Sequence, residues 1–176
     1  KKITIKVNNI SFLVTTKYAP NTWYNIRKNK SWNEGVGYAI QAILNKSDSF
    51  IDIGSWFGLM SLIGAKSVGR NGKVFSFDLD PFCNKGINEN IRLNNLKNIF
   101  VFQLAIGSSN GEISLNINSG LGSSKNSIIF NNDKNNSKES LIVKQYTLDY
   151  LINKFDISPK LIKIDAEGAE HLIYLG

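Results

Sequence analysis

The spacing of hydrophobic positions changes along the chain between a period of two residues and a period near 3.6 residues. Residues Ile3 to Val7 alternate like a strand, and Ile10 to Val14 are predicted to pair with them as a hairpin. The aromatic segment from Tyr18 to Trp32 has no clear period, and helical spacing follows it over residues 35–45. The N-terminal part therefore predicts a hairpin, an unassigned segment and a helix.

Strands and helices then alternate regularly. The predicted elements are a strand over 50–53, a helix over 59–68, a strand over 73–79, a helix that begins at Pro81 and ends near Asn94, and a strand over 99–106. This βαβαβ order predicts an α/β fold with a mostly parallel sheet, right-handed crossovers and helices on both faces of the sheet.

The alternation breaks off after this third strand of the sheet. An extra strand is predicted over 112–117, and further strands are predicted over 127–130 and 141–143. The stretches 118–124 and 131–140 are rich in Asn, Ser, Gly and Lys, which predicts loops. The remaining elements are a short helix capped by Thr147 and a last strand over 161–164. The fold therefore carries a β insertion before its final strand.

Length and composition narrow the class of protein. A chain of 176 residues can bury one real core and is too short for two ordinary domains. The single cysteine, Cys83, excludes an internal disulfide and makes a reducing cytoplasm the expected location. No apolar run approaches the roughly 20 residues that span a bilayer. The net charge is +7, but the lysines look scattered, so a nucleic-acid partner is not favoured. Both ends, Lys1 and Gly176, look like cuts in a longer protein.

A glycine-containing turn follows the first strand of the predicted sheet. Residues Asp52 to Gly58 read D-x-G-x-x-x-G. Gly54 lets the chain turn at the strand end, and Gly58 permits tight entry into a helix whose N-terminus can meet an anionic group. The spacing does not match the G-x-G-x-x-G dinucleotide fingerprint or a Walker A loop. Taken alone this pattern is weak, because glycine turns after strands are common.

Acidic residues follow the other two strand ends. Asp78 ends the second strand, where carboxylates hold ribose hydroxyls in nucleotide-binding folds, and Asp80 precedes Pro81 as a turn or cap residue. The final strand runs into Asp165, with Glu167 and Glu170 directly after it. Ligands gather outside the carboxyl ends of parallel strands, so a nucleotide-like cofactor and a substrate are expected to meet at this edge. The plainer alternative for each acid is a solvated loop.

These motifs, in this order, make the chain resemble the FkbM family of S-adenosylmethionine-dependent methyltransferases. The family's D-x-G-A-x-x-G loop, F-E-P-x-P strand end and N-x-x-L-N helix end are matched by 52–58, 77–81 and 90–94. A T-L-D segment and the signature K-I-D-x-E-G-A-E follow at 147–149 and 163–170. The chain departs from the family pattern at Ser55-Trp56, where Ala-Asn is usual, and at Asp78-Leu79, where Glu-Pro is usual.

The resemblance implies a Rossmann-like class I methyltransferase fold over residues 34–176, with residues 1–33 as an N-terminal strand and aromatic extension. The C-terminal strands that usually complete the family's sheet are absent from this chain. The implied cofactor is S-adenosylmethionine, and the expected contacts to it come from Asp52, Gly54, Ser55, Gly58, Asp78, Leu104 and Ala105. The implied reaction is methyl transfer to a hydroxyl of a sugar, a glycan or a small metabolite.

The acidic turn is the expected catalytic centre. Asp165 is the first candidate for the general base, and Glu167 and Glu170 are the next candidates, because clustered carboxylates raise one another's pKa. A divalent cation held by these acids is an alternative way to acidify the hydroxyl, although no metal site is assigned. His171, the only histidine, lies past the turn, and Lys163 is expected to pair with one of the acids.

Two other functions stay open at this point. An RNA methyltransferase could use the same cofactor fold, but three carboxylates near the acceptor would repel phosphate. A non-catalytic nucleotide-binding domain is the other alternative. The acceptor is not encoded in a readable motif, and nothing indicates the oligomeric state. The variable stretch 118–140 and the aromatic N-terminal segment are where acceptor specificity is expected, with 131–140 as a mobile flap because it lacks apolar residues.

Overall fold

The computed structural model describes residues 1–7, 9–30, 32–117, 122 and 139–176. The strand expected over 127–130 lies outside the described residues, as do the flap over 131–138 and most of the loop expected over 118–124. Across the described ranges, no helix is both long enough and apolar enough to cross a lipid bilayer.

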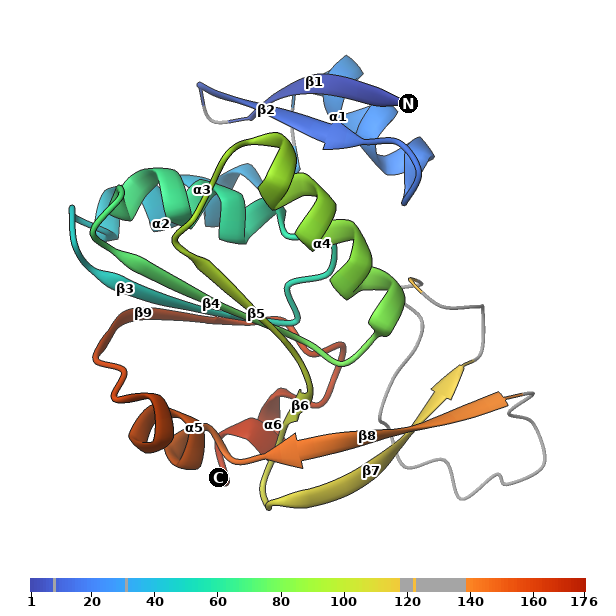
Figure 1. The fold of residues 1–176 in the computed structure, drawn as a ribbon, viewed down its shortest axis with the longest axis vertical. Helices are drawn as coiled ribbons and strands as arrows, with labels where there is room; N and C mark the ends of the chain where they lie inside the picture. The colour runs from blue at the N-terminus through green and yellow to red at the C-terminus, as the bar shows by residue number, and fades with distance from the viewer. Residues whose placement is uncertain (8, 31, 118–121, 123–138) are drawn as a thin grey trace.

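A parallel sheet forms the centre of the molecule (Figure 1). Its strand order is β5-β4-β3-β9, and each neighbouring pair is parallel. The chain moves outward from β3 to β5 through α3 and α4, then returns to place β9 on the other side of β3. The bounds are β3 (Ser49–Ile53), α3 (Leu59–Val68), β4 (Lys73–Asp78), α4 (Pro81–Leu93), β5 (Ile99–Gln103) and β9 (Pro159–Ile164). The strand order therefore reverses between β3 and β9, which is where open α/β sheets bind their ligands.

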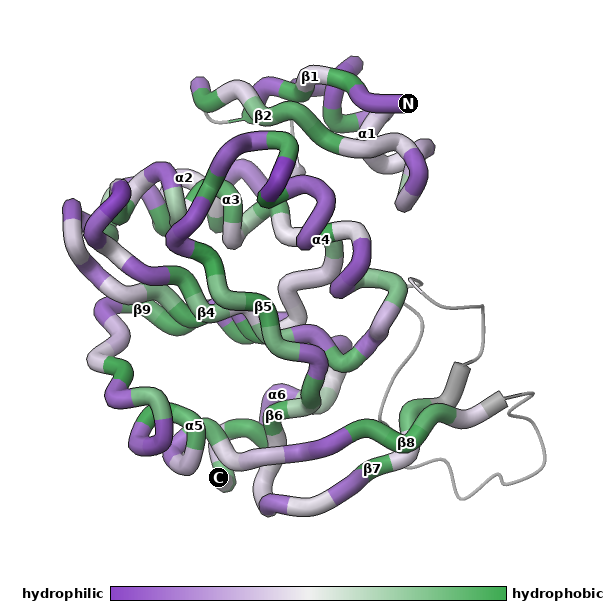
Figure 2. The backbone as a smooth tube through the Cα atoms, viewed as in Figure 1, coloured by the Kyte–Doolittle hydropathy of each residue, from purple (hydrophilic) through white to green (hydrophobic). Residues whose placement is uncertain are grey.

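Helices cover both faces of this sheet, as the sequence predicts. Side chains of α2 (Glu34–Ile43), α3 and α4 join one hydrophobic cluster with Phe50 and Val74, while α5 (Leu148–Phe155) and α6 (Glu170–Ile173) join a second cluster with Ile51 and Phe77. Successive strand residues thus point to opposite faces, and both faces are apolar. Figure 2 shows hydrophobic residues along β4, β5 and β9, with polar residues in the loops around them.

The N-terminal residues form a hairpin and a helix that pack on the same core. Strands β1 (Lys2–Val7) and β2 (Ile10–Thr15) pair antiparallel, and α1 (Pro20–Asn29) follows. This helix lies in the segment that shows no clear period in the sequence. Pro20 opens it and only Trp23 and Ile26 are buried, so its apolar stripe is too short to be read as a period. The side chains of Asn90 on α4 and of Asn94, which caps its C-terminus, bond to the backbone of β2.

A second sheet holds the insertion. Its order is β6-β8-β7, formed by β6 (Ala105–Ile106), β7 (Gly111–Ile117) and β8 (Glu139–Tyr146). The strand predicted over 99–106 is therefore divided at Leu104: β5 pairs with β4, whereas β6 pairs with β8. The expected strand over 141–143 is longer than predicted and pairs antiparallel with β7. Thr147 caps α5 as predicted, since its hydroxyl accepts a hydrogen bond from the backbone of Tyr150.

Candidate active site

A cleft of about 590 Å³ opens at the carboxyl ends of β3, β4 and β9. Seven of the residues expected at the site from the sequence line it: Gly54, Ser55, Asp78, Leu104, Ala105, Asp165 and Glu167. The other three, Asp52, Gly58 and Glu170, do not line the cleft. Each instead contacts a residue of the lining through a hydrogen bond or an ion pair. The cleft thus joins the three strand ends that carry the sequence motifs.

The turn after β3 is held in place by its neighbours. The backbone amides of Gly54 and Ser55 donate to the carbonyl of Phe77, at 2.9 and 3.1 Å. Gly54 has φ +68, and a methyl group built on it would overlap the carbonyl oxygen of Asp165. Glycine is therefore required because β9 passes directly beside this turn. The Ser55 hydroxyl is buried in the cleft wall without a hydrogen-bond partner among the described residues, so it is available to a ligand.

Gly58, at the end of the loop, allows two helices to pack closely. It precedes α3 with φ +85, and a methyl group built on it would overlap the side chain of Ile87 on α4. The second glycine of the motif therefore lets α3 and α4 approach each other behind the cleft.

Asp78 is fixed by two backbone hydrogen bonds. Its carboxylate accepts from the amide of Trp56 at 2.7 Å and from the amide of Asp80 at 2.9 Å. Burial raises the pKa of Asp78 to about 7, with smaller contributions from Asp80 and Asp52, against the two backbone bonds that lower it. Asp80 caps α4 through the amide of Phe82 and also accepts from the amide of Gly122.

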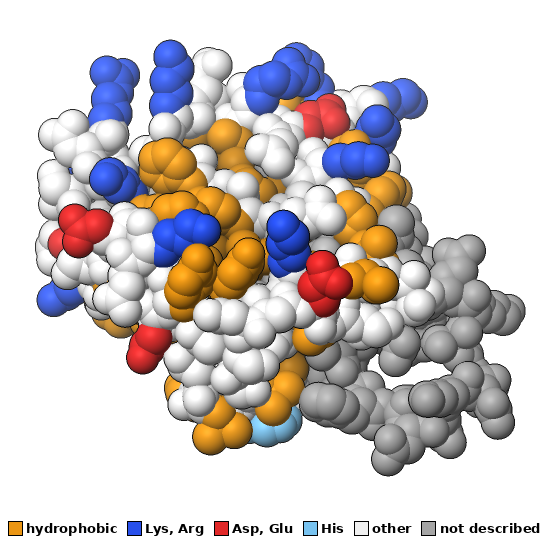
Figure 3. All heavy atoms as spheres, turned by 60° about the horizontal axis from the view of Figure 1, so that its bottom comes forward, with side chains coloured by type: hydrophobic (Ala, Val, Ile, Leu, Met, Phe, Trp, Pro, Cys, Tyr) orange, Lys and Arg blue, Asp and Glu red, His pale blue; other side chains and the backbone are white. Residues whose placement is uncertain are grey.

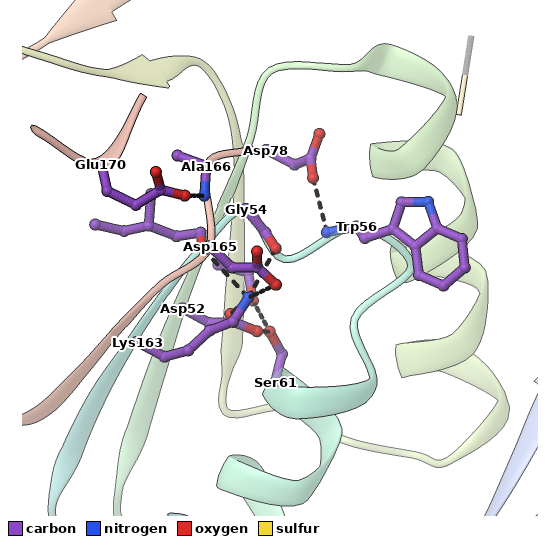
Figure 4. A network of polar contacts seen from close by, with 11 residues as sticks. Asp52, Gly54, Trp56, Ser61, Asp78, Lys163, Asp165, Ala166 and Glu170 are labelled. Carbon is purple, nitrogen blue, oxygen red and sulfur yellow. Dashed lines mark hydrogen bonds and ion pairs between the residues drawn. The ribbon is translucent and has the colours of Figure 1, made fainter. Parts of the chain in front are cut away.

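An ionic network runs from the cleft lining into the core below it (Figure 4). The ammonium of Lys163 is 3.1 Å from the fully buried carboxylate of Asp52 and 3.6 Å from that of Asp165. It also donates to the carbonyl of Gly54 at 2.9 Å. Behind Asp52, the hydroxyl of Ser61 donates to its carboxylate at 2.5 Å. Lys163 therefore ties the turn after β3 to the acid at the end of β9.

The three acids of the turn have different surroundings. The side chain of Asp165 is 54% exposed and faces the cleft. Burial raises the pKa of Glu167, and the charges of Asp165 and Glu170 add to the rise. Glu170 instead accepts hydrogen bonds from the amides of Ala166 (2.8 Å) and Gly168 (3.3 Å). The hydrogen bond from its own amide lowers the pKa of Glu170 most, and the bonds from Ala166 and Gly168 lower it further. Glu170 therefore organises the turn, which makes it a weaker candidate for the base than Asp165 or Glu167.

Aromatic side chains surround the other end of the cleft. The indole of Trp56 points away from the acidic turn (Figure 4) and stacks on Trp32, with ring centroids 6.0 Å apart. Its ring nitrogen donates to the carbonyl of Gly122 at 3.0 Å. Trp56 has φ +49, a left-handed conformation uncommon for a bulky residue. The departure from the family pattern at this position therefore extends the aromatic cluster and leaves the acidic turn free.

Comparison with known families decides where the chain belongs. The family described as "Methyltransferase FkbM domain" matches residues 36–173. The chain belongs to the FkbM methyltransferase family. Its fold is accordingly the Rossmann-like class I methyltransferase fold, with the strand order described above.

Individual proteins that resemble this FkbM domain match only part of it, at low sequence identity. An uncharacterised protein of Methanocaldococcus jannaschii is 32% identical over 65 residues, which cover 37% of this chain and 24% of that protein. A SAM-dependent O-methyltransferase from Thermotoga maritima is 20% identical, with a TM-score of 0.42 over 50% of this chain and 33% of the other. Pyrococcus horikoshii TYW2, solved with MeSAdo, is 18% identical, with a TM-score of 0.41 over 57% of this chain and 35% of TYW2. The matched segments therefore cover about a quarter to a third of the length of these proteins.

The FkbM motifs include two residues whose role is structural in this protein. Asn90 and Asn94 form the N-x-x-L-N helix end. Asn90 accepts from the amide of Thr15 at 2.9 Å and donates to the carbonyl of Phe57 at 3.1 Å, and it is fully buried. It therefore connects the N-terminal hairpin to the loop that carries Gly54 and Gly58.

The expected pairing of Lys163 with one of the acids of the FkbM signature is confirmed for Asp165, whereas its closer pairing with Asp52 is not predicted by the sequence. The position of Lys163, two residues before Asp165 and near the end of β9, was the available signal, because side chains two residues apart in extended backbone point to the same side. Its partner Asp52 sits on the neighbouring strand, opposite Lys163 in the register. Among the described residues, no group of three or more His, Cys, Asp and Glu side chains is arranged to hold a metal ion.

Proposed function

We propose that this protein is an S-adenosylmethionine-dependent O-methyltransferase that acts on a hydroxyl of a sugar, a glycan or a small metabolite. One observation carries the proposal: a cofactor-sized cleft at the strand switch point has Ser55 and Asp78 on one side and Asp165 and Glu167 on another. The fit to the cofactor is supported by the unpartnered hydroxyl of Ser55, which is buried in the wall of the cleft.

The cofactor end of the cleft would be formed by β3 and β4. Gly54 and Ser55 offer backbone and hydroxyl groups to the methionine part, and the carboxylate of Asp78 accepts the ribose hydroxyls through lone pairs not used by its two amide donors. Leu104 and Ala105 form the adjoining wall. When bound, the cofactor supplies a methyl group on a cationic sulfur, which leaves as a neutral thioether when the new carbon–oxygen bond forms.

The acceptor would lie against the acidic turn. Methyl transfer from so good a donor requires mainly that the hydroxyl be aligned and its proton removed. Asp165 is the proposed base because it faces the cleft and Lys163 holds its carboxylate from the other side. Glu167 is the alternative, since its raised pKa also suits proton acceptance. A phosphate next to the reacting hydroxyl would be repelled by both acids, which disfavours an RNA acceptor.

Two measurements test the proposal. Isothermal titration should show binding of S-adenosylhomocysteine, and Asp78→Ala should weaken it by roughly 10- to 100-fold, as expected for lost hydrogen bonds to a charged group. Failure of the unchanged protein to bind S-adenosylhomocysteine would exclude a methyltransferase, and equal affinity in Asp78→Ala would remove the role of Asp78.

The base is tested by turnover of a hydroxylated sugar acceptor in the full-length protein. Asp165→Asn keeps the side chain's shape and should leave cofactor affinity unchanged while turnover falls about 10²–10⁴-fold. Near-normal turnover in Asp165→Asn with an inactive Glu167→Gln would assign the base to Glu167. Full activity in both variants would make the acidic turn structural.

A further inference from the structure

The net positive charge of this protein arises in its N-terminal hairpin and helix. Residues 1–33 hold seven of the 21 lysines and arginines and none of the 14 acidic residues. The remaining 14 basic residues balance the 14 acidic ones, so the whole net charge of +7 arises in these 33 positions. The seven side chains are all exposed: Lys1, Lys2, Lys6, Lys17, Arg27, Lys28 and Lys30. We call this set, which lies on β1, on α1 and on the residues that flank them, the basic unit.

The basic unit adjoins the cleft. Thr22 on α1 lines the cleft, and so do Trp32 and Asn33, which follow α1 in the chain. Two aromatic rings accompany the charges here, since Tyr24 is 46% exposed and Trp32 is 39% exposed. The unit is also fixed relative to the cleft, because Asn90 and Asn94 bond β2 to α4. A ligand on the basic unit is therefore held at a constant position beside the aromatic end of the cleft, and its chain has to extend along the cleft to reach the acidic turn.

The charges near the cleft and on the basic unit have opposite signs. Asp165 and Glu167 are exposed at the strand ends, whereas the basic unit carries no carboxylate. An acceptor that fits both regions has an uncharged hydroxylated group at the acids and negative charges some distance away. Exposed aromatic rings offer flat apolar surfaces on which sugar rings can stack.

We propose that the basic unit is a docking surface for an anionic polysaccharide, which presents an uncharged sugar unit to the cleft. This inference rests on the proposed methyltransferase function and specifies its acceptor class. A polysaccharide meets the charge pattern because its acidic groups can be confined to some of its units. Single-stranded RNA meets it less well, since it carries a phosphate at every nucleotide, next to the acids as well. A bilayer surface is the other polyanion, and it would not extend a sugar into the cleft by itself.

Elsewhere on the surface, hydrophobic side chains gather in the middle of one face with Lys and Arg side chains among them (Figure 3). Exposed aromatic residues also occur near β5 and α5, where Lys154 lies 5.3 Å from the ring centre of Tyr150. The exposed rings there, Phe100, Tyr150 and Phe155, are not among the described residues that line the cleft, so the docking surface is assigned to the basic unit.

The experiment measures binding of polygalacturonate to the 176-residue chain, with neutral dextran of equal length as the reference. Polygalacturonate carries a carboxylate on every sugar unit, so it probes the basic unit and not the fit of an uncharged sugar at the acids. Binding should be selective for polygalacturonate and should weaken when salt is raised from about 50 mM to about 300 mM. A triple lysine-to-glutamine variant of the basic unit should bind on the order of tenfold more weakly. A matched triple variant of exposed lysines outside the unit removes the same charge and should bind normally. The two sets are Lys2, Lys6 and Lys28, and Lys66, Lys97 and Lys160.

Three outcomes would overturn the docking surface: no binding of polygalacturonate, equal losses in the two triple variants, or tighter binding of poly(U) or of phosphatidylglycerol vesicles. S-adenosylhomocysteine titration on the same samples separates the two proposals. A chain that binds S-adenosylhomocysteine but not polygalacturonate refutes the docking surface alone. A chain that binds the polymer but not S-adenosylhomocysteine refutes the proposed function and the acceptor role with it.

Discussion

Asp78 has a pKa close to physiological pH, so its charge and the proposed cofactor affinity should depend on pH. Ribose hydroxyls donate to a charged carboxylate, and the pKa of Asp78 is raised to about 7. Affinity for S-adenosylhomocysteine should therefore rise by roughly tenfold between about pH 6 and about pH 8, following the ionised fraction. Titration calorimetry across this range measures it. Asp78→Asn should bind weakly at every pH, and an unchanged pH profile in that variant would assign the dependence to another group.

The raised pKa of Asp78 should make the stability of the fold decrease with pH, whereas it makes the proposed cofactor affinity increase. The pKa of Asp78 in the folded protein lies above its model value of 3.8, so the folded state holds this proton more tightly than the unfolded state. The stability contributed by this group is complete below about pH 4 and is lost as pH rises toward 7. Above pH 7 it should change no further, which urea unfolding of the unchanged protein and of Asp78→Asn can compare.

Lys163 should be needed both for stability and for the proposed turnover. Replacing it by Met leaves the carboxylate of Asp52 buried without a counter-charge, which should lower the free energy of unfolding by about 3 kcal/mol. Adding Asp52→Asn to Lys163→Met removes that charge and should restore part of the stability but not turnover, because Asp165 stays unsupported. A double-mutant cycle, measured by urea unfolding and by activity, compares the single and double variants. Equal activity in Lys163→Met and the unchanged protein would leave Lys163 a purely structural residue.

At the scale of elements, the junction of β3 and β9 should be intolerant of any side chain at Gly54. The amide of Asp165 donates to the carbonyl of Ile53 at 3.1 Å, and the carbonyl oxygen of Asp165 itself occupies the space beside Gly54. Gly54→Ala adds a steric overlap and a strained φ, and should lower the free energy of unfolding by about 3 kcal/mol or more.

Gly35→Ala, in α2, is the matched control. Nothing lies within 4 Å of a methyl group there, and alanine should stabilise α2 by up to about 1 kcal/mol. Thermal unfolding of both variants tests the pair, and similar stabilities would contradict the close approach of the two strands.

At the scale of the whole molecule, the N-terminal hairpin and the sheet should unfold together. Side chains of β1, β2 and α1 belong to the same hydrophobic cluster as those of α2 and α3. Asn90 bridges them, and Asn90→Ala would leave the amide of Thr15 and the carbonyl of Phe57 unpaired in the interior. The expected loss is about 2–4 kcal/mol with one cooperative transition.

Asn88→Ala on the exposed side of α4 controls for helix propensity and should change stability by less than about 0.5 kcal/mol. Tryptophan fluorescence and far-ultraviolet circular dichroism should give coincident transitions in both variants. A hairpin that unfolds first, with the sheet intact, would show instead that residues 1–33 are a separate unit. The boundary expected near residue 34 stays a prediction until this is measured.

Most of the sheet and its helices could be predicted from the sequence because their signals are local. The helix Leu59–Val68 is bounded by Gly58 and Gly69, and Pro81 with Asp80 marks the start of α4. The FkbM motifs predicted the family for the same reason, since each is a short run at a strand or helix end, and the match over residues 36–173 confirmed it. The contacts expected between individual residues and the cofactor stay predictions.

What only the tertiary structure decided involves residues far apart in the chain. The sequence by itself determined where strands end in acids and glycines, since period and turn chemistry act over a few residues. It did not determine that Lys163 pairs with Asp52, that Asp165 is what approaches Gly54, or that the chain leaves β4 at Leu104 to pair with β8. These depend on which strands become neighbours, and strand pairing is chosen by burial of the whole core. The physical reason is the same in each case: a local pattern selects an element, and packing selects its partners.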